Sequence, residues 1–336
     1  RALVGEGGAR VGVGVAHAGG VAVEHESCAT FRWVVIWVRV GEPLGGHHRG
    51  SMTSLNSPTP EALGVTVPHF SPAALDHLIG QIAPLLPPPP RRGPKGMPIL
   101  ERVQLALAHL REGVSLRGLA RIRGIPPTTL RDNVNPVLAA LDQLTPVLPD
   151  GSPIEDFDDI IGWCAEHGGT VIVDGTDFGV AKPSGDKAQR PFYSGKRKAH
   201  TTKTIAVTDG ASNLLWATPM VPGATHDITA LRDAELAVHL ADSGLDVLAD
   251  SGFQGLQHDV ATIELPTRRR RGDRALTRVD RFFNTVLARA RVRVEHGIGR
   301  LKQWRCLTAH KQRRDLLERW LPVCWALTSF QQAWPR

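Results

Sequence analysis

The spacing of apolar residues divides the chain into a helical first part and a mixed second part. Apolar residues recur at helical spacing in "SPAALDHLIGQIAPLL" and in "ILERVQLALAHLREG", which begins at Ile99 and stops at Gly113. Another helix is predicted from "SLRGLARIRG", with Ser115 as its N-cap, and the next begins near Pro126–Thr128. After Asp150 the pattern changes to short runs of β-branched and aliphatic residues, which predict strands.

The middle of the helical part has the turn architecture of a helix-turn-helix. Ala120 stands where two helices approach closely, Gly124 lies in the turn, and Ile125 is the expected buried anchor. A generic helical hairpin would give the same pattern. Basic residues favour contact with DNA, and these are Arg117, Arg121, Arg123 and Arg131.

The second part predicts an α/β domain with a mixed sheet. The predicted elements are strands at 169–181, 198–210 and 212–221, a helix at 226–240, a buried strand at 245–255, a basic loop at 266–278, and helices at 279–304 and 315–330. A tight Asp-Gly turn is expected to join the second and third strands as a hairpin.

Composition marks the predicted boundaries. Residues 1–51 begin with Arg1, are rich in Gly, Ala and Val, and lack an amphipathic period; because the first methionine is Met52, we expect them to be non-native or disordered. Residues 52–96 hold a short helix and the stiff basic linker "PPPPRRGPKGMP". We therefore expect an all-α helix-turn-helix domain at 97–145, followed by a catalytic domain at 155–332.

Charge and cysteine usage narrow the class of partner. Hydrophobic residues make up 42% and charged residues 22% of the chain, as in ordinary globular proteins. The net charge of +7 and a pI near 9.6 favour a polyanionic partner. The four cysteines are far apart without a CxxC pair, which argues against a zinc knuckle or a disulfide framework and fits a reducing cytoplasm. The apolar run "FRWVVIWVRV" is too short to span a bilayer.

Three carboxylates fall at positions where metal-dependent chemistry could occur. Asp174 ends the first predicted strand of the second part, Asp250 ends the last strand, and Glu295 lies on the long basic helix. Functional groups gather at strand ends in open α/β sheets. Carboxylates brought together there would repel one another without a counter-ion. Mg²⁺ or Mn²⁺ is the cation that suits oxygen ligands, and two such ions can assist an in-line displacement at phosphorus.

The long helix carries two cations beside its carboxylate. At about 100° per residue, Arg291, Glu295 and Lys302 fall within roughly 40° of one another on the helix. An Arg–Glu pair one turn apart is also a common surface stabiliser, worth about 0.2–0.5 kcal/mol. However, Gly297 and Gly299 each cost a helix about 1 kcal/mol relative to Ala. Helix stability alone therefore does not explain this stretch.

Five short blocks follow one another along the second part of the chain: "VDGTDF", "YSGKRKAHTTK", "PGATHD", "LADSGFQG" and "RVEHGIGRLKQWRCL". Together they resemble the DDE transposases of bacterial insertion sequences, in the branch related to the eukaryotic Harbinger transposases. The resemblance covers about residues 94–310. In that family the last block often reads Y-x2-R-x3-E-x6-K, which Arg291, Glu295 and Lys302 match, whereas Ala288 stands in place of Tyr.

The resemblance implies a ribonuclease H-like fold on which Asp174, Asp250 and Glu295 form a catalytic, metal-binding triad for Mg²⁺ or Mn²⁺, with two ions. Arg291 and Lys302 would contact phosphates beside the cleavage point. The implied reaction is hydrolysis of a phosphodiester at the ends of the element, followed by attack of the freed 3′-OH on target DNA. The implied partner is double-stranded DNA, both terminal repeats and target, bound by a homo-oligomer on paired ends in the bacterial cytoplasm, at the nucleoid and away from membranes.

Other polar residues have more than one interpretation. Lys196, Lys198 and Arg269 lie in charge runs that are either solvated loops or contacts to the DNA backbone, and we favour contacts for them. Asp177 is either a metal ligand or a cap of the turn after its strand, and we favour the cap. Asp227 either N-caps the helix that follows it, which we favour, or has a role near the active site.

Two further functions fit parts of the pattern. A non-catalytic DNA-binding regulator, or a domesticated transposase, would use the helix-turn-helix alone, although the intact acidic triad argues against lost catalysis. A repair or restriction nuclease would share the fold, but the Arg-Glu-Lys helix matches transposases better.

Overall fold

The computed structural model describes residues 70–88, 96–269, 275–309 and 312–335. The expectations for residues 1–51, for Met52 and for most of the linker before residue 96 lie outside these ranges. All described residues belong to one compact unit, Asn56–Arg336. The two domains predicted at 97–145 and 155–332 both fall within it, and the division between them stays a prediction. None of the helices in the described ranges is long and apolar enough to cross a membrane.

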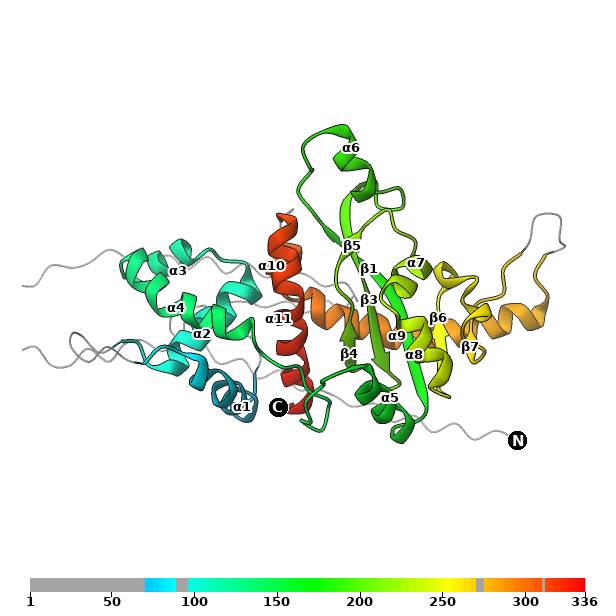
Figure 1. Cartoon of the computed structure of the whole chain (residues 1–336), viewed down its shortest axis with the longest axis horizontal. Helices are drawn as coiled ribbons and strands as arrows, with labels where there is room; N and C mark the ends of the chain where they lie inside the picture. Colours follow the sequence, from blue (N-terminus) through cyan, green and yellow to red (C-terminus); the bar gives the residue numbers. More distant parts are fainter. Residues whose placement is uncertain (1–69, 89–95, 270–274, 310–311, 336) are drawn as a thin grey trace, which may run out of the picture. The chain divides into compact units, whose positions relative to one another are not determined.

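The helices predicted in the first part are present. They are α1 (Pro72–Ile82), the 3₁₀ turn η2 (Ala83–Leu85), α2 (Ile99–Glu112), α3 (Leu116–Arg123) and α4 (Pro127–Leu141) (Figure 1). Ser71 and Ser115 cap α1 and α3 by accepting backbone N–H groups. Gly113 and Gly124 end α2 and α3 at φ 64°, a left-handed conformation that glycine adopts without a steric penalty.

The second part forms the predicted α/β fold with a mixed sheet. Its strands are β1 (Thr170–Gly179), β2 (Tyr193–Ser194), β3 (Ala199–Asp209), β4 (Leu214–Ala217), β5 (Val221–Pro222), β6 (Asp246–Ala249) and β7 (Ile263–Glu264). The order is β2-β3-β1-β6-β7, and β4 and β5 also pair with β3. β1 is antiparallel to β3 and parallel to β6. This mixed sheet is compatible with the ribonuclease H-like fold implied by the resemblance.

The turn between β3 and β4 differs from the prediction. A tight Asp-Gly turn was expected, but the connection is the longer segment 210–213, in which Ser212 has φ 74°. Asp209 explains the difference, because its Oδ1 accepts the backbone N–H groups of Ala211 and Asn213 at 2.9 and 2.8 Å. A side chain therefore closes this turn, and Gly210 is not its left-handed residue.

The helix predicted at 226–240 is also interrupted. It forms α7 (Asp227–Asp233) and α8 (Leu236–Asp242), separated by Glu235 at φ 59°. The remaining short helical elements of this part are α5 (Phe157–Glu166), α6 (Asp186–Gln189), η3 (Arg190–Phe192), η4 (Ser251–Phe253) and η5 (Leu256–His258).

Three C-terminal helices complete the described fold. They are α9 (Arg278–Lys302), α10 (Arg305–Thr308) and α11 (Arg314–Ala333). A capping box between Thr277 and Asp280 begins α9. The later part of α9 packs on β1, β3, β4 and β6 through the buried Val294, Ile298 and Leu301. α10 packs on α2, and α11 on β4 and α1, so helices of both parts share one hydrophobic core (Figure 1).

Candidate active site

Two of the predicted carboxylates come together where the parallel pairing of the inner strands β1 and β6 ends, and we call this place the acidic edge. The last paired residues of the two parallel strands are Val173 and Ala249. Asp174 and Asp250 are the next residues of the chain after this last pair, and Asp250 lies close enough to Asp174 to repel its charge. The register of two buried parallel strands therefore creates a pair of neighbouring carboxylates.

The surroundings of Asp174 disfavour its charge. The side chain is 20% exposed. Burial raises the pKa of Asp174 to about 6, and repulsion by Asp250 is the next cause. Arg291 and the backbone N–H of Gly175 lower this pKa, and Asp227 adds a smaller repulsion. Two acidic groups held this close favour either a proton or a cation between them.

Local hydrogen bonds fix both carboxylates. Oδ1 of Asp174 accepts the N–H of Gly175 at 2.8 Å. Oδ1 of Asp250 accepts the N–H of Gly252 at 2.5 Å, where η4 begins. Each side chain is thus held by the backbone of its own segment.

Helix α9 contributes two cations to this edge. Nη2 of Arg291 lies 3.8 Å from Oδ2 of Asp174. Nε of Arg291 is buried and has no hydrogen-bond partner among the described residues. Burial, and then Arg197, lower the pKa of Lys302, while Asp177 and Asp174 act against them. Lys302 and Arg291 therefore lie close enough to feel the charge of Asp174.

Glu295 does not join the two strand carboxylates in this structure. Its side chain is exposed on α9, one helical turn from Arg291. Within the described ranges, no three His, Cys, Asp or Glu side chains are grouped so that they could hold a metal ion. The structure thus brings Asp174, Asp250, Arg291 and Lys302 together, and the complete triad stays a prediction.

Asp227 has a different position from the one expected. The N-cap of α7 is His226 and makes no side-chain capping bond, whereas Asp227 is the first residue of the helix. Oδ1 of Asp227 lies 2.7 Å from Nζ of Lys203 on β3. Sequence analysis missed this ion pair, because its partners are 24 positions apart and meet only through the fold. The one available signal was an acidic residue at the start of a predicted helix.

Asp177 does not cap a turn as expected. It lies within β1, where it is paired with Lys203 of β3, and its side chain is only 10% exposed. One of its oxygens is 3.5 Å from Nε of Arg197. The prediction was wrong because β1 continues past this residue to Gly179.

The predicted DNA-contacting residues lie on separate elements. Lys196 and Lys198 are exposed in the turn between β2 and β3, where Lys198 has φ 53°. Arg131 is exposed on α4, and Arg269 is exposed in the segment after β7. Of these residues, Lys196 lines a cavity of about 330 Å³ that Lys203, Asp177 and Asp227 also line.

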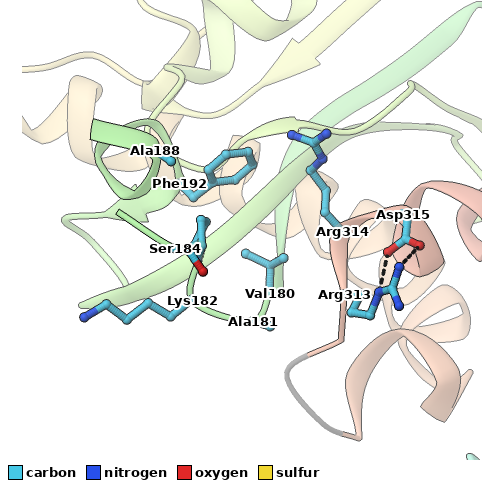
Figure 2. Close-up of a pocket in the computed structure, with 10 residues that line it drawn as sticks. Val180, Ala181, Lys182, Ser184, Ala188, Phe192, Arg313, Arg314 and Asp315 are labelled. Carbon is cyan, nitrogen blue, oxygen red and sulfur yellow. Dashed lines mark hydrogen bonds and ion pairs between the residues drawn. The ribbon is translucent and has the colours of Figure 1, made fainter. Parts of the chain in front are cut away.

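A second cavity, of about 430 Å³, lies where the chain leaves β1 (Figure 2). It is lined by residues that include Val180, Phe192, Arg313 and Arg314. Arg313 donates two hydrogen bonds to Asp315, and Arg314 pairs with Glu318 and stacks over the ring of Phe192. Both arginines are thus engaged by neighbouring side chains. The acidic edge of β1 and β6, with its repelling carboxylates, is the stronger candidate for chemistry.

Comparison with known proteins indicates the family that the second part of the chain resembles. Residues 173–329 match the family described as DDE superfamily endonuclease. The matched range begins one residue before Asp174 and includes Asp250, Arg291, Glu295 and Lys302. The resemblance to DDE-superfamily insertion-sequence transposases is therefore confirmed.

A curated relative carries the same indication. The chain is 29% identical over 144 residues to a protein of Microchaete diplosiphon described as a probable transposase for insertion sequence element IS702. The aligned region covers 43% of this chain and 50% of that protein, so the chain spans about half the length of the relative. No solved structure matches the chain.

Proposed function

We propose that the chain, whose residues 173–329 match the DDE superfamily endonucleases, is the DNA transposase of an insertion sequence. The proposed reaction is metal-dependent hydrolysis at the ends of the element, followed by strand transfer into target DNA. One observation carries the proposal. Asp174 and Asp250 meet at one sheet edge beside Arg291, which has a buried donor without a partner among the described residues.

The donor set fits a hard divalent cation. Two neighbouring carboxylates, one with its pKa raised to about 6, are stabilised by a cation with oxygen preference. We propose that Asp174, Asp250 and Glu295 hold Mg²⁺ or Mn²⁺, with two ions in the active complex. When bound, such ions lower the pKa of a coordinated water and stabilise the charge on the leaving oxygen. Glu295 would have to turn toward the sheet edge, one helical turn from Arg291.

The chain's own cations would position the DNA. Arg291 would donate to a phosphate oxygen beside the scissile bond, which gives its buried Nε a partner. Lys302 would contact the adjacent phosphate from the same edge of α9. Lys196, Lys198 and Arg269 would contact the backbone further away, so that binding weakens steeply with salt.

The proposed reaction makes and breaks the following bonds. The oxygen of a water attacks phosphorus at the end of the element, and the bond from phosphorus to the 3′ oxygen breaks, which leaves a 3′-OH. That hydroxyl then attacks a phosphorus of target DNA, where a new 3′ ester forms as the old one breaks. Each displacement is a direct exchange at phosphorus, so one set of carboxylates serves both.

The helices of the first part would recognise the ends of the element. We propose that residues 97–145 act as a helix-turn-helix domain, because the sharp turn at Gly124 joins two helices whose outer faces carry Arg117, Arg121 and Arg131. Arg123 instead pairs with Glu101 of α2. A homo-oligomer would pair two DNA ends in the bacterial cytoplasm, at the nucleoid.

A nicking assay tests the proposal. The substrate is DNA that carries the inverted repeats flanking the gene, with Mg²⁺ or Mn²⁺ present. Asp250→Ala is expected to abolish strand cleavage while binding to the ends persists. Cleavage that survives in this variant would contradict the assignment of the carboxylates. A wild-type chain that binds the ends but never nicks them would favour the non-catalytic regulator.

A further inference from the structure

A buried ion pair lies directly behind the acidic edge of β1 and β6. Lys203 of β3 and Asp227 of α7 are 11% and 19% exposed, and Nζ lies 2.7 Å from Oδ1. Nζ also donates to the carbonyl oxygen of Thr225 at 2.6 Å. Lys203 therefore ties the start of α7 to the centre of the sheet.

The carboxylate of Asp227 fills a space that two glycines leave open. A Cβ atom on Gly175 would lie 2.6 Å from Oδ1 of Asp227, and a Cβ atom on Gly252 would lie 2.5 Å from Oδ2. Neither glycine has a positive φ, so space and not backbone conformation requires glycine at both positions. One carboxylate thus abuts two separate backbone segments.

Those two segments carry the strand carboxylates. Gly175 directly follows Asp174 and donates its N–H to that side chain. Gly252 donates its N–H to Asp250, and Oδ1 of Asp250 lies 2.8 Å from the same Cβ position that Asp227 blocks. A displacement of Asp227 would therefore be transmitted to both carboxylates through the backbone groups that hold them.

We propose that Lys203 and Asp227 are a positioning pair that sets the separation of Asp174 and Asp250; this inference rests on the proposed function. Oδ1 of Asp227 is paired with Lys203, and this carboxylate abuts Gly175, whose N–H holds the side chain of Asp174. Asp227 thus acts through its neighbours. Removing one member of a buried pair leaves an uncompensated charge, whereas removing both charges with similar shapes is far less disruptive.

The test compares Asp227→Asn, Lys203→Met and the double variant K203M/D227N in the full chain. The readouts are Mn²⁺ affinity by calorimetry, kcat and KM for nicking, and folding by circular dichroism. Each single variant is expected to lower Mn²⁺ affinity and kcat about 10–100-fold, as loss of an outer-shell partner does, with KM for DNA unchanged. The double variant is expected to bind Mn²⁺ about tenfold more tightly than either single variant, because the two losses are coupled.

Asp259→Asn is the matched control. It removes the ion pair between Asp259 and Arg232, which is also on α7 but exposed, and should leave Mn²⁺ affinity and kcat unchanged.

Several results would overturn the inference. A double variant as defective as Asp227→Asn would show that Asp227 itself binds the metal. Single variants that bind Mn²⁺ and nick DNA like the wild type would show that the pair positions nothing, with the proposed function intact. If Mn²⁺ binding and kcat fall only in proportion to the fraction of folded protein measured by circular dichroism, the pair has a structural role alone. A wild-type chain that neither binds Mn²⁺ nor nicks DNA would overturn the proposed function and this inference together.

Discussion

The strand side and the helix side of the candidate active site are built differently. On the strand side, Asp174 and Asp250 are set by the parallel register of β1 and β6 and by hydrogen bonds from their own backbones. On the helix side, Arg291 reaches Asp174, but Glu295 remains exposed. Strand pairing fixes the register and spacing of neighbouring backbones, whereas the position of a side chain on a helix also depends on the rotation of the helix and on the rotamer.

The helix side is therefore the part of the site in which a side chain, Glu295, is free of the hydrogen bonds that fix Asp174 and Asp250. The buried stripe of Val294, Ile298 and Leu301 holds α9 on the sheet. Glu295 lies beside that stripe, between the two cations of the same edge. The proposed triad requires Glu295 to turn from solvent toward the two strand carboxylates.

The largest effect is expected from two single variants, one that removes a carboxylate of the strand side and one that removes the carboxylate of the helix side. Asp174→Asn and Glu295→Gln should each reduce nicking by more than about 100-fold, beyond the usual loss for an outer-shell partner. Glu318→Gln on α11, an exposed acid paired with Arg314, is the control and should nick normally. Equal losses would show that both sides act together. Normal nicking by Glu295→Gln would remove the helix side from the metal site.

The next effect concerns the pH dependence of stability on the strand side. Since the pKa of Asp174 is about 6 in the folded chain and near 3.8 when unfolded, the folded state binds this proton more tightly. This stabilisation is fully present below the unfolded pKa and is lost as pH rises through 6, a change of at most about 3 kcal/mol. Asp174→Asn should therefore be more stable than the wild type at pH 7.5, and the difference should shrink toward pH 4.5.

Urea unfolding with EDTA, at several pH values, measures this difference in the free energy of unfolding. Comparing the variant with the wild type removes the contribution of all other titrating groups. A stability difference that does not depend on pH would show that Asp174 has an ordinary pKa.

A smaller effect is expected where α9 contacts the sheet. A Cβ atom on Gly297 would lie 2.5 Å from Cγ2 of Thr208 on β3. Gly297→Ala should therefore destabilise the fold by about 1–3 kcal/mol and shift α9, because overpacking forces neighbours to move. Thermal unfolding checks the stability. An unchanged melting temperature would mean that α9 is less closely packed on β3 than described.

The smallest effect is expected two residues away. A Cβ atom on Gly299 would meet no heavy atom within 4 Å. Gly299→Ala should stabilise the chain by up to about 1 kcal/mol, because alanine is the better helix former. It is also the matched control for Gly297→Ala. Destabilisation by Gly299→Ala would indicate a contact on this face of α9 that the fold does not contain.

The sequence predicted what depends on local pattern. The β-branched runs predicted both strands, and helical periodicity predicted α9 to within a few residues of its ends. The prediction that Asp174 ends its strand was wrong, because β1 continues to Gly179 in pairing with β3, whereas Asp250 does follow the end of β6. The contacts it could not predict join distant segments. Lys203 and Asp227 are in contact because α7 packs on β3, and the periodicity of the sequence does not predict this packing.

Local errors have equally specific causes. The Asp-Gly turn was wrong because the Asp209 side chain, not glycine, closes the connection. The helix at 226–240 was predicted as continuous because Glu235 is a good helix former, yet it adopts φ 59°. The orientation of Glu295 could not be predicted, because the helical angle gives the position of a residue around the helix axis but not the rotamer of its side chain.

Anomalous scattering from a crystal of the chain soaked in Mn²⁺ would show whether the three carboxylates share a metal ion. We expect a Mn²⁺ peak with oxygen atoms of Asp174, Asp250 and Glu295 as ligands, at about 2.1 Å. A Mn²⁺ ion bound by the two strand carboxylates with Glu295 still in solvent, or no ion at this edge, would contradict this expectation.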